Sequence, residues 1–89
     1  MPKLPNITAR EIIRVAKNLG YYKDRQKGSH ATFRHHQTGH SVTIPIHKGR
    51  TLDKGLLHGI IGELELTDEE FLKLLKKWSS QGQALQTPQ

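Results

Sequence analysis

The 89-residue sequence contains no cysteine, which excludes disulfides and thiolate metal ligands. It has no apolar run near the roughly 18 residues of a membrane span, and no visible signal peptide. Only 34% of its residues are hydrophobic and 6% aromatic, so the core is that of one small domain. Residues 79–89 have too little apolar content to pack and are expected to be disordered. We therefore expect a single cytoplasmic domain at 1–78 that binds no membrane.

Acidic residues are scarce in the first two thirds of the chain. Residues 1–58 hold eleven Lys and Arg but only Glu11, Asp24 and Asp53, a net charge of +8. Residues 59–89 hold three lysines and five acids, a net charge of −2. A basic body of this kind favours a polyanionic partner, of which nucleic acid is the commonest. Two-metal hydrolysis is disfavoured, because it needs clustered carboxylates.

Two capping boxes mark the starts of helices. In segments 8–11 (TARE) and 67–70 (TDEE), a threonine hydroxyl and a glutamate carboxylate are spaced to accept from each other's backbone N–H. Apolar residues then recur at helical spacing, which predicts helices over about 8–19 and 67–78. The apolar residues that flank the second box favour docking of the last helix on its own domain, with a homodimer surface as the alternative.

The same helical spacing predicts a helix over about 53–64. It contains Gly55, Gly59 and Gly62, each of which weakens a helix by roughly 1 kcal/mol relative to alanine. We interpret the three glycines as a sign that this helix approaches the sheet closely.

Between the first two helices, apolar and polar residues alternate with the period of a β-strand. The pattern predicts a three-stranded antiparallel sheet, with strands over about 22–27, 30–36 and 41–46. The order is therefore α-β-β-β-α with an added C-terminal helix, an α+β fold in which the helices cover one face of the sheet. The residues expected to face the helices are Phe33, Val42, Ile44 and Ile46, and those expected to face solvent are His30, Thr32, Arg34 and Thr43.

Six histidines is a high count for this length. Three of them, His35, His36 and His40, flank the second hairpin loop, where they form either a metal cluster or a polar hairpin tip. No HExxH or Cys/His spacing accompanies them, so we expect no metal. His58, on the predicted second helix, is expected to be a surface or boundary residue.

The segment 25–30 (RQKGSH) places a histidine beside several phosphate-binding side chains. His30 and, further on, His47 both lie at strand ends among cations, where a phosphate would collect. Histidine suits the base and acid roles of RNA transesterification, in which the 2′-hydroxyl attacks the neighbouring phosphate without a metal. The pattern alone leaves open that His30 is an exposed strand residue with no special role.

Taken together, four sequence features resemble the HicA (YcfA-like) mRNA interferase toxins: Gly20-Tyr21, the segment 25–30, the segment 42–47 (VTIPIH) and Lys54-Gly55. The resemblance covers about residues 7–71. It implies a double-stranded-RNA-binding-domain-like fold, in agreement with the order derived from the pattern. It also implies a bacterial-type toxin that cleaves mRNA without a metal or other cofactor and is neutralised by a HicB-type antitoxin covering its active site.

The resemblance further assigns the catalytic role to His30, the histidine that follows the Gly-Ser pair. A rival interpretation is a non-catalytic RNA-binding module that uses the same fold and cations, and an inactive copy of the toxin is a third. Either the toxin or the binding module would take RNA, single-stranded or structured. The predicted RNA-binding residues are Arg25, Lys27, Ser29, Arg34, His47 and Lys48.

Overall fold

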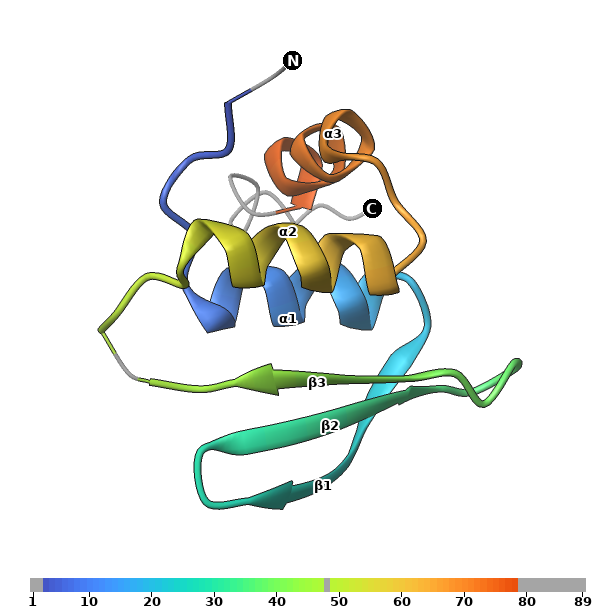
Figure 1. Ribbon diagram of the computed structural model, residues 1–89. Coiled ribbons are helices and arrows are strands. Elements are labelled where there is room, and N and C mark those ends of the chain that lie inside the picture. Colours follow the sequence, from blue (N-terminus) through green and yellow to red (C-terminus); the bar gives the residue numbers. More distant parts are fainter. Residues whose placement is uncertain (1–2, 48, 79–89) are drawn as a thin grey trace.

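The computed structural model describes residues 3–47 and 49–78 of the chain (Figure 1). In these residues a helix, three antiparallel strands and two further helices follow one another, which confirms the predicted α+β class. The disorder predicted for residues 79–89 falls outside the described part. No described helix is long and apolar enough to cross a membrane. The elements are α1 (Ala9–Asn18), β1 (Tyr21–Lys27), β2 (His30–His35), β3 (Ser41–Pro45), α2 (Lys54–Glu63) and α3 (Asp68–Trp78).

Both capping boxes form. At the start of α1, Thr8 Oγ1 accepts the Glu11 N–H over 3.4 Å, and Glu11 Oε1 accepts the Thr8 N–H over 2.9 Å. At the start of α3, Thr67 and Glu70 exchange the same two bonds over 3.0 and 2.8 Å. Each box satisfies backbone donors that a helix start leaves without partners, which fixes where the helix begins.

The three strands lie in the order β1-β2-β3, with β2 in the centre. In the β2–β3 register, Phe33 lies opposite Val42 and Thr32 opposite Thr43. The Thr32 and Thr43 hydroxyls are 3.2 Å apart on the face turned away from the core. The alternation predicted from the sequence is therefore confirmed. The buried residues of β2 and β3 are Ala31, Phe33, Val42 and Ile44, and Ile46 packs partly buried against them.

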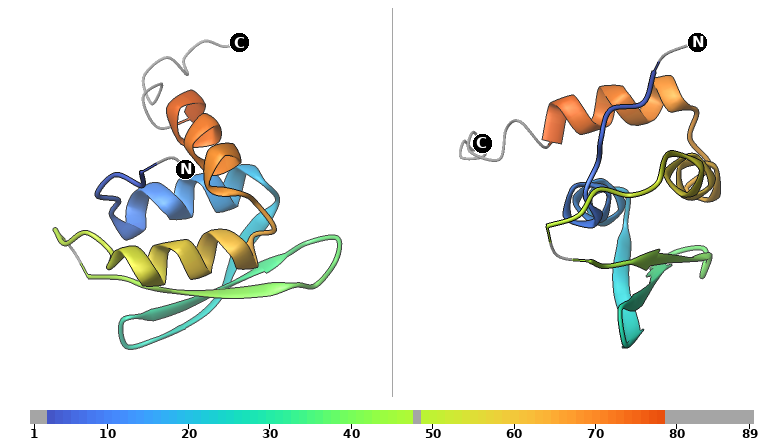
Figure 2. Two further views of the ribbon diagram at one scale, coloured as in Figure 1. Left: turned by 45° about the horizontal axis from the view of Figure 1, so that its top comes forward. Right: turned by 60° about the vertical axis from the view of Figure 1, so that its left-hand side comes forward.

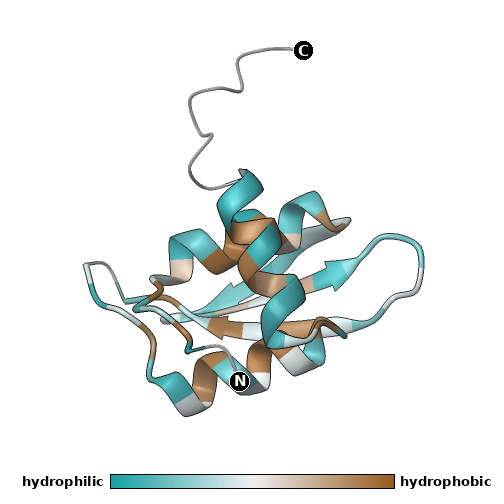
Figure 3. Ribbon diagram, turned by 90° about the horizontal axis from the view of Figure 1, so that it is seen from above, coloured by the Kyte–Doolittle hydropathy of each residue, from teal (hydrophilic) through white to brown (hydrophobic). Residues whose placement is uncertain are grey.

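All the described helices lie on one side of the sheet, as Figures 1 and 2 show. α1 and α2 form a layer against the sheet, and α3 lies across the far side of that layer. The helices are amphipathic. Figure 3 shows their apolar residues (brown) turned inward and their hydrophilic residues (teal) turned outward. The opposite face of the sheet is not covered by any described element.

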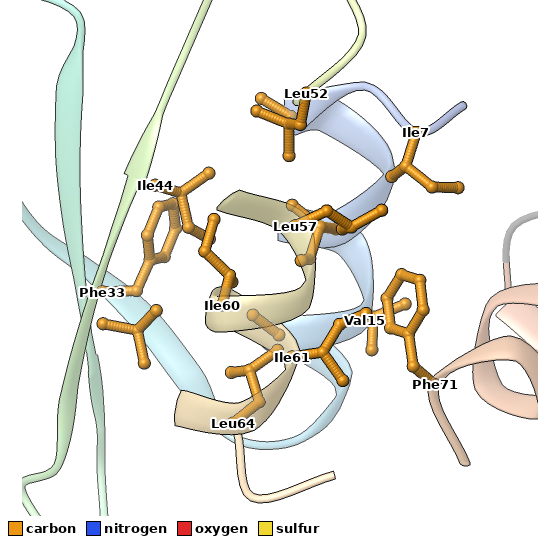
Figure 4. Close-up of a cluster of buried hydrophobic side chains, with 14 of the residues drawn as sticks. Ile7, Val15, Phe33, Ile44, Leu52, Leu57, Ile60, Ile61, Leu64 and Phe71 are labelled. Carbon is orange, nitrogen blue, oxygen red and sulfur yellow. The ribbon is translucent and has the colours of Figure 1, made fainter. Parts of the chain in front are cut away.

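The core lies between the sheet and α1–α2, and it continues to α3 (Figure 4). Phe33 and Ile44 extend from the sheet toward Ile60 of α2. On the other side of α1 and α2, Phe71 of α3 is fully buried beside Val15. The added helix therefore docks on its own domain, as the apolar residues around its capping box indicated.

The glycines of α2 do not mark a close approach to the sheet, and this prediction was wrong. A Cβ atom added at Gly59 or Gly62 would meet nothing within 4 Å, and one at Gly55 would meet only Asp53 Oδ2, at 3.2 Å. The glycines lie on the solvent side of the helix, because its other side is already filled by larger side chains. The buried residues of α2 are Leu57, Ile60 and Ile61.

α2 ends in a Schellman motif with a glutamate at the left-handed position. The Leu66 N–H donates to the Ile61 carbonyl over 3.1 Å, and the Glu65 N–H donates to the Gly62 carbonyl over 2.9 Å. Glu65 has a φ of 63°, a conformation that costs an L-residue about 1–2 kcal/mol and that glycine adopts freely.

A two-residue turn, Gly28-Ser29, joins β1 to β2 and places Lys27 opposite His30. Gly28 has a φ of 59°, and positive φ at the first central residue is characteristic of a type II′ turn. The Ser29 carbonyl accepts the Ile46 N–H over 2.6 Å, which ties the turn to the end of β3. The glycine of the RQKGSH segment is thus explained by the turn that carries His30.

A β-bulge interrupts β1 at Asp24. Lys23 pairs with Phe33, but the next paired residue is Arg25, which lies opposite Thr32. Because side chains alternate along a strand, the extra residue shifts the rest of β1 to the opposite face. The bulge therefore places Arg25 and Lys27 on the face turned away from the core.

Candidate active site

A hollow of about 500 Å³ opens between the turn end of the sheet and the start of α2. His30, the first residue of β2, and His47, which follows β3, both line it. The sequence predicted that each lies at a strand end, and the structure brings the two imidazoles to one hollow. Its lining is His30, Thr43, Pro45, His47, Thr51, Leu52, Asp53 and Leu56.

The pairing of β2 with β3 brings the two histidines to the same place. His30 lies directly opposite Pro45 in the register, and His47 follows two residues later. The bond between the Ser29 carbonyl and the Ile46 N–H extends this pairing past the end of β3. Both imidazoles are exposed, so a ligand reaches them from solvent.

The far wall of the hollow is held by the segment before α1. The Leu52 N–H donates to the Ile7 carbonyl over 2.7 Å, and Thr51 forms an isolated β-bridge with Thr8. Ile7 and Leu52 are both buried, so the wall is anchored in the core. Sequence reasoning missed this wall, because the pairing joins segments more than forty residues apart.

The start of α2 completes the hollow. Asp53 Oδ2 caps the helix, accepting the N–H of Gly55 over 3.1 Å and of Leu56 over 3.3 Å. Leu56 is 43% exposed at the edge of the hollow, one of two large hydrophobic side chains that are exposed among the described residues. The hollow therefore combines imidazoles and hydroxyls with an apolar edge.

The predicted cations lie beside the hollow and do not line it. Arg25 and Lys27 are exposed on β1, and Arg34 lies four residues along β2 from His30, about 13 Å for an extended strand. Arg34 Nη1 donates to the Gly39 carbonyl over 3.1 Å. Ser29 contributes its carbonyl to the turn, as described above. Lys48 lies outside the described residues.

Residues 9–66 match the family model of the HicA toxin of bacterial toxin-antitoxin systems. The chain belongs to this family. As a HicA-family member it is a toxin of a toxin-antitoxin system, which implies an antitoxin as its partner. The match includes the whole sheet, the hollow and α2, but ends before α3. No curated protein matches the chain.

Two of the three histidines around the second hairpin loop of this HicA-family chain, His35 and His40, make structural hydrogen bonds through their side chains. His35 Nε2 lies 2.9 Å from the Leu19 carbonyl, while Nδ1 accepts the backbone N–H of Gln37 over 3.1 Å. A carbonyl can only accept, so Nε2 carries the proton and both ring nitrogens are engaged. His40 Nε2 lies 2.7 Å from the Glu63 carbonyl. No group of three or more potential metal ligands occurs among the described residues.

A second hollow, of about 320 Å³, lies beside Tyr21 and His35 at the other end of the sheet. The two rings meet edge to face with centroids 5.0 Å apart. Burial raises the pKa of the Tyr21 phenol, and the negative charges of Glu65 and Glu63 raise it further. His58, as expected, is exposed, and its Nδ1 lies 3.0 Å from Asp68 Oδ1.

Proposed function

We propose that this HicA-family toxin is an endoribonuclease that cleaves mRNA without a metal, with His30 as its catalytic residue. The observation that carries the proposal is that His30 and His47 line one solvent-accessible hollow beside a cationic strand pair. mRNA as the substrate would place its action in the cytoplasm.

The chemistry follows from these groups. His30, neutral, takes the proton of a ribose 2′-hydroxyl, and the 2′-oxygen forms a bond to the adjacent phosphorus. The bond from phosphorus to the 5′-oxygen then breaks, and that oxygen takes a proton from the imidazolium of His47, the other imidazole of the hollow. Lys27, opposite His30 in the register, stabilises the charge that accumulates on the phosphate oxygens. The products are a 2′,3′-cyclic phosphate and a 5′-hydroxyl.

The decisive experiment compares the wild type with His30→Ala in a cleavage assay on a purified mRNA in EDTA. Loss of a general base lowers the rate by roughly 10²- to 10⁴-fold, and the variant should no longer arrest growth on expression. His58→Ala is the matched control, because it removes an exposed imidazole of α2 that does not line the hollow. If His30→Ala cleaves as fast as the wild type, the assignment is wrong.

The same assay separates the enzyme from a non-catalytic RNA-binding module. The module would bind RNA with strong salt dependence and leave it intact, with or without His30. An enzyme that uses one imidazole as base and another as acid should show a bell-shaped dependence of kcat/KM on pH, which His47→Ala would reduce to a single limb.

For the antitoxin we propose a HicB-type protein that covers the hollow. The exposed Leu56 gives such a protein an apolar contact beside otherwise polar residues. Leu56→Asp should weaken co-purification with the antitoxin encoded beside the toxin, whereas Lys73→Asp on α3 should not. Sedimentation of the His30→Ala protein tests the alternative of a homodimer, because a monomer at all concentrations would exclude it.

A further inference from the structure

The face of the sheet opposite the helices carries side chains that the hollow does not account for. We call it the uncovered face; its residues on β1 and β2 are Tyr22, Arg25, Lys27, His30, Thr32 and Arg34. In Figure 1 it is the lower side of the sheet, and no described element lies across it. His30 lies at one end of the uncovered face, and Tyr22 lies with Arg34 at the other.

Tyr22 is the unusual residue of this face. Its neighbour Tyr21 is 8% exposed, whereas Tyr22 is 45% exposed. In the register Tyr22 lies directly opposite Arg34, so the two side chains leave the same face as nearest cross-strand neighbours. A tyrosine and an arginine at opposite positions of an open sheet offer the two kinds of planar group on which nucleic-acid bases stack.

The bulge at Asp24 is a second and independent sign that this face is organised around a ligand. Without the extra residue, strict alternation would place Arg25 and Lys27 on the side opposite to Tyr22. With it, the phenol, both cations and His30 share one face. Among the described residues, Asp24 is the acid next to this cluster, and its carboxylate contacts Arg25 and Arg34.

We propose that the uncovered face binds single-stranded RNA, with Tyr22 as the platform for a base away from the cleaved phosphate. The RNA would run along β2 from Arg34 toward His30, with its phosphates next to the cationic side chains of the uncovered face. Single-stranded RNA is the occupant that fits, because a base inside a duplex already stacks on both sides and leaves no face for Tyr22. This inference deepens the proposed function by defining where the substrate lies.

The test measures binding in the His30→Ala background, so that cleavage does not interfere. A fluorescein-labelled 12-nucleotide single strand and a hairpin duplex of the same composition are titrated at one fixed salt concentration. Tyr22→Ala should weaken single-strand binding roughly 5- to 100-fold, the range for loss of one stacked base. Tyr22→Phe, the matched control that keeps the ring, should stay within about twofold. Duplex binding should not respond to either change.

The platform also has a spectroscopic readout. Tyr22→Trp should bind the single strand at least as tightly as the parent, with its fluorescence quenched as a base stacks on the indole. Unchanged single-strand affinity in Tyr22→Ala, or an equal loss for single strand and duplex, would overturn the inference. If single-strand binding depends on Tyr22 but the wild type cleaves no RNA, the nuclease proposal is rejected and the stacking role of Tyr22 is supported. If cleavage depends on His30 but binding does not depend on Tyr22, the stacking role is rejected and the nuclease proposal is supported.

Discussion

Asp24 Oδ2 lies 3.6 Å from Arg34 Nη2 across the β1–β2 strand pair, and the same oxygen lies 2.9 Å from Arg25 Nη1. The carboxylate thus neutralises two cations on the face that we propose for RNA. Asp24→Asn should tighten RNA binding by roughly two- to fivefold, because exposed ion pairs of this kind are worth at most about 1 kcal/mol. The measurement is fluorescence anisotropy with a single-stranded RNA in the His30→Ala background.

Glu69→Gln is the control for this prediction. It removes the same charge from an exposed position on α3, on the far side of α1 and α2 from the sheet. Its effect on affinity should be much smaller and should disappear at higher salt. Weaker binding in Asp24→Asn would show instead that Asp24 holds the arginines in their binding geometry.

Substitution of two glycines by alanine should have opposite effects on stability. Gly28 has space around it but a φ of 59°, so Gly28→Ala should lower the free energy of unfolding by about 1 kcal/mol. Gly59 is helical and equally open, so Gly59→Ala should raise it by up to about 1 kcal/mol. Urea denaturation monitored by circular dichroism gives both values. The explanation fails if the two changes have the same sign.

The left-handed glutamate at the end of α2 predicts a stabilising substitution. Glu65→Gly should raise the free energy of unfolding by about 1 kcal/mol, because glycine adopts this φ without strain. Glu65→Ala removes the same charge but keeps the strain, so it separates the two effects. A gain in the alanine variant equal to that of glycine would assign the effect to charge.

Tyr21 predicts a loss of stability at alkaline pH. Its pKa is raised in the folded protein, so the unfolded chain gives up the proton first. The stabilisation that the protonated Tyr21 phenol gives the folded protein is therefore complete below about pH 10, the ordinary pKa of tyrosine. It falls as the pH rises toward the pKa of Tyr21 in the folded protein. Tyr21→Phe should show a shallower decline of unfolding free energy between pH 9 and 11. Tyr22→Phe, at an exposed ring, serves as the control.

Local patterns in the sequence predicted most of the fold. The capping box of Thr8 and Glu11 depends on residues three apart, and the alternation around Phe33 depends on residues two apart. Such short-range rules also placed His30 on the open side of β2. They succeeded because helix capping and the burial of one strand face both depend on residues that are close together in the sequence.

Features that depend on distant contacts were not predicted. The Leu52 N–H donates to the Ile7 carbonyl in the far wall of the hollow, and His35 binds the Leu19 carbonyl. Each of these contacts joins segments that are far apart in the sequence. The glycines of α2 were misinterpreted because helical spacing alone does not say what occupies the opposite side. The bulge at Asp24 has no sequence signature of its own, yet it decides which face Arg25 and Lys27 occupy.

The bridge between Thr8 and Thr51 has a consequence for the order in which the protein is made. Residues on both sides of the hollow are synthesised at different times, and Leu56 is the last of them. A nascent chain that stops before Thr51 carries both histidines of the hollow without the opposite wall. The hollow that holds both imidazoles is therefore finished only after Leu56 has been added to the growing chain.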